Sequence, residues 1–237
     1  MIELLLRRRM MAMSKKEPFV NPYITDGLIL HLDGIEKGST PDAWTDLVNG
    51  VVFTKKGSGV TFNSDNVQFG GSSNNALHNL TTYDFVRSTV GTIEVCYRDI
   101  ATSGSRTVFY TYAEGASTGT ICFQFVGGNR VSFSTGNASS RPQNGAWTAE
   151  STGTYSVSNA RAYQNGINKG YTSDKTYITK TIVGTIIGCS GRASSTYFDP
   201  LNGKIHSIRI YNRHLTEEEV LHNQSIDNTR FHLGLTI

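Results

Sequence analysis

The fold is decided by residues 202–223, which read NGKIHSIRIYNRHLTEEEVLHN. Residues 204–211 of this stretch predict a strand, because β-branched and aromatic residues are frequent in it. Ile205 and Ile208 have opposite parity along the strand, so they cannot share one face of a regular strand. We therefore expect either a β-bulge near Ser207 or burial of both faces.

Residues 216–224 predict a short helix that follows the strand at once. Thr216 is placed as the N-cap, where its hydroxyl accepts from the Glu219 amide and the Glu219 carboxylate accepts from the Thr216 amide. The three carboxylates of residues 217–219 fall in the first turn, where the helix dipole stabilises negative charge. We interpret these acids as helix-starting residues rather than as catalytic ones.

Residues 203–220 resemble the closing signature of laminin-G-like, concanavalin A-like jelly-roll domains. In that signature a last core strand, roughly G-x-I-x-x-[VI]-R-I-Y-N-R-x-L-[ST]-x-x-E, is followed by such a helix. Residues 27–33 and 44–47 resemble the opening strand and loop of the family, and residues 161–166 resemble its Y-V-N-G hairpin. Together these stretches cover about residues 26–231, so the resemblance implies a lectin-like domain over nearly the whole chain.

Other strands are predicted by apolar alternation between turn signals, which recur at roughly 8- to 12-residue spacing. They are expected at residues 28–32, 51–53, 60–62, 66–69, 92–98, 106–112, 120–126, 131–133, 153–157, 161–164 and 181–188, with a long loop at 33–50 and a tight hairpin at 127–129. Asn165 and Gly166 form the strongest hairpin signal, because both tolerate the positive φ of a type I′ turn. Alternation directs Glu94 and Cys96 away from the core, so burial of Cys96 requires cover from another part of the chain.

These patterns predict an all-β fold, a two-sheet antiparallel jelly-roll sandwich of the concanavalin A-like kind, with a short N-terminal helical arm and a short C-terminal helix. A single domain fits, because the chain has no Pro-rich or Gly/Ser-rich linker and sandwiches commonly exceed about 200 residues as one unit. We assign residues 1–25 to an N-terminal docking arm and connector, and residues 26–237 to the jelly-roll domain.

Positive charge is concentrated at the start of the chain. Residues 1–16 carry five basic residues and one acidic residue, a net charge of +4, which leaves 17 basic and 18 acidic residues, or −1, in the remainder. A nearly neutral body has none of the basic footprint of a nucleic-acid-binding protein. No nucleic-acid partner is therefore expected.

The arm is predicted to dock the protein onto a partner. Its docking residues are expected to be Leu4, Leu5, Leu6, Arg7, Arg8, Arg9, Met10 and Met11. A short amphipathic helix of this kind can insert into another protein or pack along a sibling subunit, so a homo-oligomer is expected. The alternative is a disordered or wrongly assigned start. The segment does not resemble a secretory signal, because its apolar residues precede the arginines, and it is too short to form a membrane span.

Cys96, Cys122 and Cys189 are an odd number of cysteines at wide spacing, and each lies in or beside an apolar run. We expect buried free thiols; the alternative is one disulfide with one thiol left over. The sequence has no Cys-x-x-Cys or paired-histidine spacing that indicates zinc.

The sequence carries no recognisable catalytic pattern. The family that it resembles includes glucanases, which cut glycosidic bonds with strand carboxylates spaced as in E-x-D-x-x-E, and this triplet is missing here. A retaining glycosidase needs carboxyl groups about 5 Å apart. Glu94 and Asp99 are expected on opposite faces, whereas Glu114 and Glu150 stand alone. We therefore predict that the protein is not an enzyme.

Carbohydrate binding is the function that the resemblance supports, because strand ends and loops can present aromatic, amide and guanidinium groups to a sugar. The candidate residues are Tyr110, Tyr112, Trp147, Arg192 and Tyr197. Trp44, by resemblance, and His31 are expected to be packing residues rather than ligands.

No cofactor is predicted from the residues themselves, but the resemblance leaves calcium as a possible ligand. Family members often bind calcium through loop Asp and Asn oxygens, and Asp33, Asp46 or Asp65 could supply them here. The sequence has no dense Asp/Asn run of the calcium-loop type to support that site.

A virion is the setting that best combines a lectin-like fold with free thiols and no secretion signal, because a virion protein is made in the host cytoplasm. Similar domains occur in proteins of bacterial viruses and gut bacteria. Our first hypothesis is a non-enzymatic bacteriophage structural protein, a capsid decoration, head fibre or tail component, whose arm binds other virion proteins and whose domain binds host, bacterial or mucosal glycans. The alternatives are a purely structural virion subunit without sugar binding, and a carbohydrate-binding protein or degenerate glycoside hydrolase of the bacterial cell surface.

Overall fold

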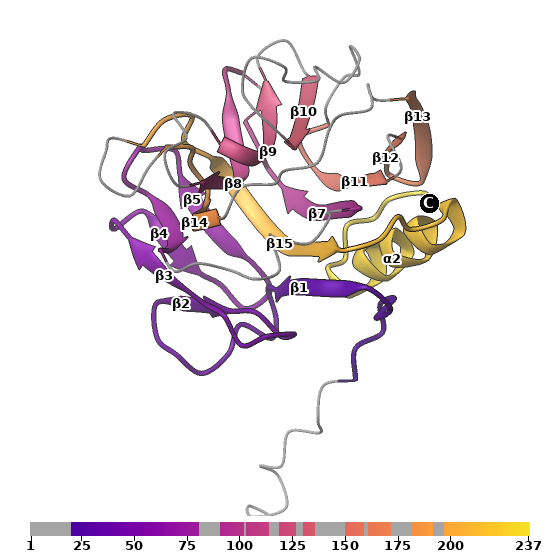
Figure 1. The fold of residues 1–237 in the computed structure, drawn as a ribbon, viewed down its shortest axis with the longest axis horizontal. Helices are drawn as coiled ribbons and strands as arrows, with labels where there is room; N and C mark the ends of the chain where they lie inside the picture. The colour runs from indigo at the N-terminus through magenta and orange to yellow at the C-terminus, as the bar shows by residue number, and fades with distance from the viewer. Residues whose placement is uncertain are drawn as a thin grey trace, which may run out of the picture.

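A computed structural model describes residues 20–80, 91–101, 103–113, 119–126, 130–135, 150–158, 161–171, 182–191 and 197–237. The predicted docking residues of the arm, the hairpin at 127–129, and the candidates Trp147 and Arg192 lie outside these ranges. The described chain folds into two antiparallel sheets and one C-terminal helix, so the predicted two-sheet sandwich is confirmed (Figure 1).

The eight-stranded sheet has the order β13 (Ile167–Tyr171), β12 (Arg161–Gln164), β11 (Gly153–Ser158), β7 (Thr92–Arg98), β15 (Asn202–Tyr211), β5 (Val67–Gly70) and β4 (Val60–Phe62), with β1 (Leu28–Asp33) also paired to β15. The seven-stranded sheet has the order β10 (Arg130–Thr135), β9 (Gly119–Val126), β8 (Arg106–Ala113), β14 (Ile182–Ile187), β6 (Ala76–Asn79), β3 (Val52–Lys56) and β2 (Ala43–Thr45). β2 lies in the segment predicted to be a loop, and β6 was not predicted. Both are short strands of three or four residues, which carry little periodic signal.

β15 occupies the centre of the eight-stranded sheet. β7 pairs along one side of it, while β5 pairs with residues 202–205 and β1 with residues 207–211 on the other side. The register with β7 shifts between Ile205 and Ser207, and every residue from Ile205 to Tyr211 is buried. The predicted bulge and the predicted burial of both faces therefore occur together.

The hydrophobic core lies between the two sheets. Aromatic side chains connect them: the rings of Tyr97 and Phe125 are 4.9 Å apart, and those of Tyr155 and Phe123 are 5.5 Å apart, both edge to face. Trp44 is fully buried, and its indole nitrogen donates to the Asp33 carbonyl at 2.8 Å, which confirms its packing role. The rest of the core consists of aliphatic side chains and of Phe53, Phe69 and Phe109.

The helix α2 (Glu217–Arg230) begins as predicted. The Glu219 amide donates to the Thr216 hydroxyl at 3.3 Å, and the Thr216 amide donates to the Glu219 carboxylate at 2.9 Å, which completes the capping box. The helix continues to Arg230 instead of ending at residue 224. Its buried face in the later turns consists of Asn223, Gln224 and Asp227, so the apolar periodicity that marks a helix in sequence is missing there.

α2 covers the outer face of the eight-stranded sheet with a layer of polar contacts. Glu94 points away from the core as predicted, but it is buried, because Asn223 of α2 donates to its carboxylate at 2.8 Å. Arg209 donates to the Glu94 carboxylate at 2.9 Å and to Asp227 of α2 at 2.8 and 2.6 Å. Cys96 is buried on the same face, so its required cover is supplied by α2.

Three further predictions from sequence are confirmed. Asn165 and Gly166 join β12 to β13 with φ values of 51° and 78°, the positive φ that a type I′ hairpin requires. The three cysteines are free and buried. His31 is also buried, with Asn21 3.5 Å from its ring, as expected for a packed residue.

Candidate functional site

The outer face of the seven-stranded sheet gathers three of the predicted carbohydrate-binding residues. Phe109 of β8 faces the core, so its neighbours Tyr110 and Tyr112 point to the outer side. Tyr197 packs against both of them in one cluster. We call the surface formed by Lys56, His78, Tyr110, Tyr112 and Tyr197 the tyrosine face.

Two basic side chains hold Tyr197 in place on the tyrosine face. The Nδ1 atom of His78 lies 3.2 Å from the Tyr197 hydroxyl, within hydrogen-bonding distance. The Lys56 ammonium lies 3.8 Å from the centre of the Tyr197 ring, a cation–π contact. Burial lowers the pKa of His78, and the charge of Lys56 lowers it further, so the imidazole is neutral near pH 7.

Gly184 makes room for Tyr112. The two residues are directly opposite each other in the pairing of β14 with β8. A Cβ atom at Gly184 would overlap the phenol ring of Tyr112, so the ring lies flat over this position. A glycine in the interior of a strand commonly marks such a close approach.

A polar network borders the tyrosine face. Gln124 donates to the Thr107 hydroxyl at 2.7 Å and to the Asp199 carboxylate at 3.2 Å, and the Ser190 hydroxyl donates to the same carboxylate at 3.1 Å. The segment that carries Tyr197 is fixed to the sheet by this network and by the paired backbone groups of Ser190 and Phe198. Ser190 and residues 197–199 are therefore held together beside the sheet.

The predicted tyrosines are buried, whereas a neighbouring aromatic ring among the described residues is exposed to solvent. Tyr110, Tyr112 and Tyr197 are only 7%, 8% and 1% exposed, whereas Phe198 is 58% exposed. Phe198 was not among the candidates predicted from the sequence. Lys56 and His78 were also missed, because a single basic residue in a short strand carries no sequence signal for binding.

Two of the three acidic residues considered for calcium, Asp33 and Asp46, are engaged by protein groups. Arg230 donates to both carboxylate oxygens of Asp33, at 2.9 and 3.1 Å. Asp46 accepts from three backbone amides, those of His31, Val48 and Asn49. Within the described ranges, no group of three His, Cys, Asp or Glu side chains is arranged to hold a metal ion.

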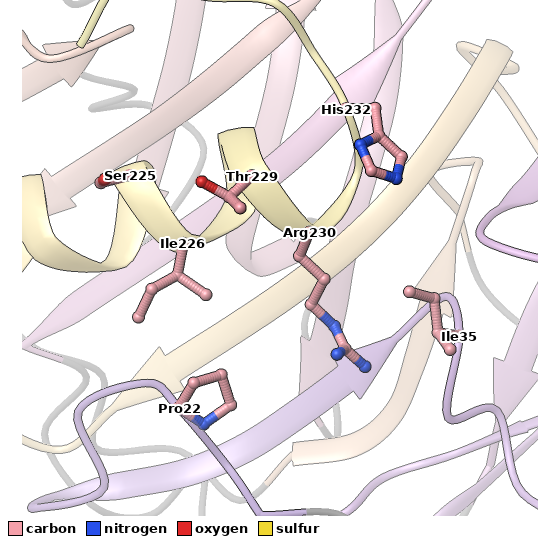
Figure 2. Close-up of a pocket in the computed structure, with 7 residues that line it drawn as sticks. All are labelled: Pro22, Ile35, Ser225, Ile226, Thr229, Arg230 and His232. Carbon is pink, nitrogen blue, oxygen red and sulfur yellow. The ribbon is translucent and has the colours of Figure 1, made fainter.

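A concave region lies on the opposite side of the sandwich from the tyrosine face, beside α2. This groove has a volume of about 450 Å³ and is lined by Pro22, Ile35, Ser225, Ile226, Thr229, Arg230 and His232. Figure 2 shows Arg230 extending from the helix toward Ile35. Because its guanidinium is already paired with Asp33, the groove offers mainly apolar contacts from Ile35, Ile226 and Pro22.

The family of the chain follows from its sequence and fold together. Residues 63–221 match the model of the concanavalin A-like lectin/glucanases superfamily, of the laminin G type. The chain belongs to this superfamily. A search of curated proteins gave no match.

Solved structures with a similar fold include sialidases and a sialidase-associated module. A Trypanosoma rangeli sialidase in complex with sialic acid gives a TM-score of 0.61 at 14% identity, over 96% of this chain and 39% of that one. The Ruminococcus gnavus IT-sialidase CBM40 bound to α2,3-sialyllactose gives 0.51 at 14% identity, over 68% of this chain and 96% of that one. A leech intramolecular trans-sialidase gives 0.52 at 16% identity, over 73% and 28%.

These similarities concern the fold. At such identities they establish the jelly-roll sandwich and not a shared ligand. The chain spans about two fifths of the trypanosomal sialidase that it matches. No helix in the described part of the chain is long and apolar enough to cross a membrane.

Proposed function

We propose that this protein is a non-enzymatic carbohydrate-binding protein whose site is the tyrosine face together with Phe198. The observation that carries the proposal is the exposed ring of Phe198, the residue that follows Tyr197, whose own ring holds the Lys56 ammonium. An exposed aromatic ring gives a sugar an apolar surface to stack on, and a neighbouring ammonium and neutral imidazole give hydrogen bonds to its hydroxyl or carboxylate groups. Membership of a superfamily of lectins and glucanases supports the same function.

Three carboxylates of the described chain support a binding role over hydrolysis. Glu94 is buried and paired with Arg209, and Asp199 accepts hydrogen bonds from Gln124 and Ser190. Glu150 accepts from Asn165 at 2.7 Å. Glycoside hydrolysis requires a pair of carboxyl groups facing one sugar-binding cleft, and these three groups lie in separate networks.

The binding site can be tested by single substitutions in the full chain. Phe198→Ala and Lys56→Gln are each expected to weaken binding to a recognised glycan by about tenfold or more, because each removes a direct contact at the centre of the site. Ile167→Ala is the control, because Ile167 is 56% exposed but lies on β13 of the other sheet. Isothermal titration calorimetry measures the effect. Equal affinity of the unmodified protein and the three variants for the glycan would show that the binding site is not at Phe198 and Lys56.

We further propose that the protein works in a bacteriophage virion, as a capsid decoration, head fibre or tail component, with the bacterial cell surface as the alternative setting. Three free buried thiols fit synthesis in a reducing cytoplasm. The connector at Pro22 and the groove lie on the α2 side of the sandwich, and the tyrosine face lies on the other. A protein anchored through its N-terminal segment would thus present the tyrosine face outward.

Deletion of residues 1–18 tests the docking part of this proposal. The truncated protein is expected to keep the near-UV circular dichroism of the full chain, because Tyr23 and Ile24 are tied to α2 through Asp227 and Asn223. It is expected to lose self-association and binding to other virion proteins, as measured by analytical ultracentrifugation and co-sedimentation with particles. An unchanged association state and unchanged particle binding would argue against a docking arm.

The burial of the three tyrosines supports one alternative, a purely structural subunit. In that function Tyr110, Tyr112 and Tyr197 stabilise the loop and bind no sugar. This alternative predicts no glycan binding and no effect of Phe198→Ala on any carbohydrate.

A further inference from the structure

Three polar side chains project into the sandwich from neighbouring positions on the inner face of the eight-stranded sheet. Tyr155 of β11 is directly opposite Gln164 of β12, and Tyr97 of β7 is opposite Gly153, two residues before Tyr155. Tyr97 and Tyr155 belong to the hydrophobic core. Gln164 shares their side, because Ala162, two residues earlier on the same strand, is also a core residue.

Four polar atoms of this trio are buried without a protein partner. They are the hydroxyl oxygens of Tyr97 and Tyr155 and both the nitrogen and the oxygen of the Gln164 carboxamide, none of which has a hydrogen-bond partner among the residues that the structure describes. Their neighbour Asn165 is fully engaged, since its side chain bonds the Thr154 amide at 2.8 Å and Glu150 at 2.7 Å. Buried groups of this kind are almost always satisfied in native proteins, either by protein or by ordered water.

The residues around Tyr97, Tyr155 and Gln164 limit which molecule could form hydrogen bonds with their buried polar atoms. Phe125 and Phe123 of the opposite sheet pack edge to face against Tyr97 and Tyr155, so that side of the trio is apolar and an ionised ligand would be costly to bury there. Burial raises the pKa of both phenols, so both are protonated and can donate as well as accept. The carboxamide also offers donors and an acceptor. A matching ligand must therefore be small, neutral and able to donate and accept at once.

We propose that Tyr97, Tyr155 and Gln164 form an internal hydration site that binds ordered water between the two sheets. Water meets each requirement, because it is neutral, fits between packed side chains and makes about three hydrogen bonds at buried sites. A sugar or other polyol is too large to reach atoms that are sealed from solvent on every side. The site is separate from the tyrosine face, which lies on the outer side of the other sheet.

Two nearly isosteric substitutions test the hydration site. Tyr155→Phe and Gln164→Met each remove polar atoms from the trio and keep its volume. Both are expected to reduce the number of long-lived internal water molecules, as measured by oxygen-17 magnetic relaxation dispersion. Both should also lower the melting temperature by about 2–4 °C, the shift that corresponds to one lost buried hydrogen bond in a chain of this size.

Tyr163→Phe is the matched control. Tyr163 lies on β12 beside Gln164 but faces the other side, where its hydroxyl bonds Glu217 at 3.4 Å. It should leave the water signal unchanged. An unchanged water signal in Tyr155→Phe and Gln164→Met, together with unchanged or higher melting temperatures, would overturn the proposal, because groups left truly unsatisfied cost stability and their removal relieves that cost. If either Tyr155→Phe or Gln164→Met fails to fold, the water signal and melting temperature of the other variant test the proposal.

Discussion

Replacement of Arg209 by leucine is expected to lower the free energy of unfolding by about 3–5 kcal/mol, the usual loss when one partner of a buried ion pair is removed. Arg209 is fully buried and pairs with Glu94 of β7 and with Asp227 of α2. Burial acts to lower the pKa of Arg209, but the Asp227 and Glu94 carboxylates outweigh it and hold that pKa above its ordinary value. Leucine would leave both carboxylates buried without their cation.

The loss should be measured by urea unfolding at pH 7, with Lys204→Leu as the matched control. Lys204 lies on the same strand and pairs with Asp99 at 2.7 Å, but both side chains are partly exposed. A surface pair contributes at most about 1 kcal/mol, so the control should change little. If Arg209→Leu were no more destabilising than Lys204→Leu, the polar layer beneath α2 would not hold the helix on the sheet.

The second large effect is a loss of stability in acid that depends on His31. Burial and the charge of Arg209 lower the pKa of His31 from 6.5 to about 3. The folded protein therefore keeps the imidazole neutral while the unfolded chain takes up a proton below pH 6.5. Stability contributed by His31 is present above pH 6.5 and is lost as the pH falls toward 3, by about 4–5 kcal/mol in all.

His31→Gln should remove that part of the pH dependence. Between pH 7 and pH 4 the unmodified protein is expected to lose about 3 kcal/mol more than the variant, as followed by urea unfolding at each pH. Asp33, Arg230 and Tyr23 surround the imidazole and are unchanged in the comparison. His222→Gln, at an exposed position of α2, is the control and should keep the full dependence. If the free energy of unfolding fell by the same amount between pH 7 and pH 4 in His31→Gln and in the unmodified protein, His31 would not be the source of this pH dependence.

The sequence predicts the parts of this fold that are set by local chemistry. The capping box at Thr216 and the hairpin at Asn165 depend on residues within a few positions of each other, and both occur as expected. The parity conflict between Ile205 and Ile208 marks the bulge in β15 correctly. Each of these features leaves its signal in a short stretch of residues, which a single sequence contains.

Features that depend on distant residues could not be predicted. Glu94 alternates like a solvent-facing residue, and only the packing of α2 onto β7 and β15 buries it. Tyr110 and Tyr197 occupy a strand and a loop as expected, but the contact between them buries rings that were predicted to meet a sugar. Phe198 is exposed next to Asp199, whose polar network joins residues far apart in the chain and leaves no signal in a short stretch.

The central claim is that the tyrosine face and Phe198 bind carbohydrate, and a glycan array probed with the full chain tests it most directly. The array should be read once with calcium and once with EDTA, beside Phe198→Ala. We predict reproducible binding to bacterial or mucosal glycans in both conditions, because the candidate calcium ligands Asp33 and Asp46 are already engaged by protein groups, and a marked loss with Phe198→Ala. A blank array in both conditions, or binding that Phe198→Ala leaves untouched, would contradict the claim.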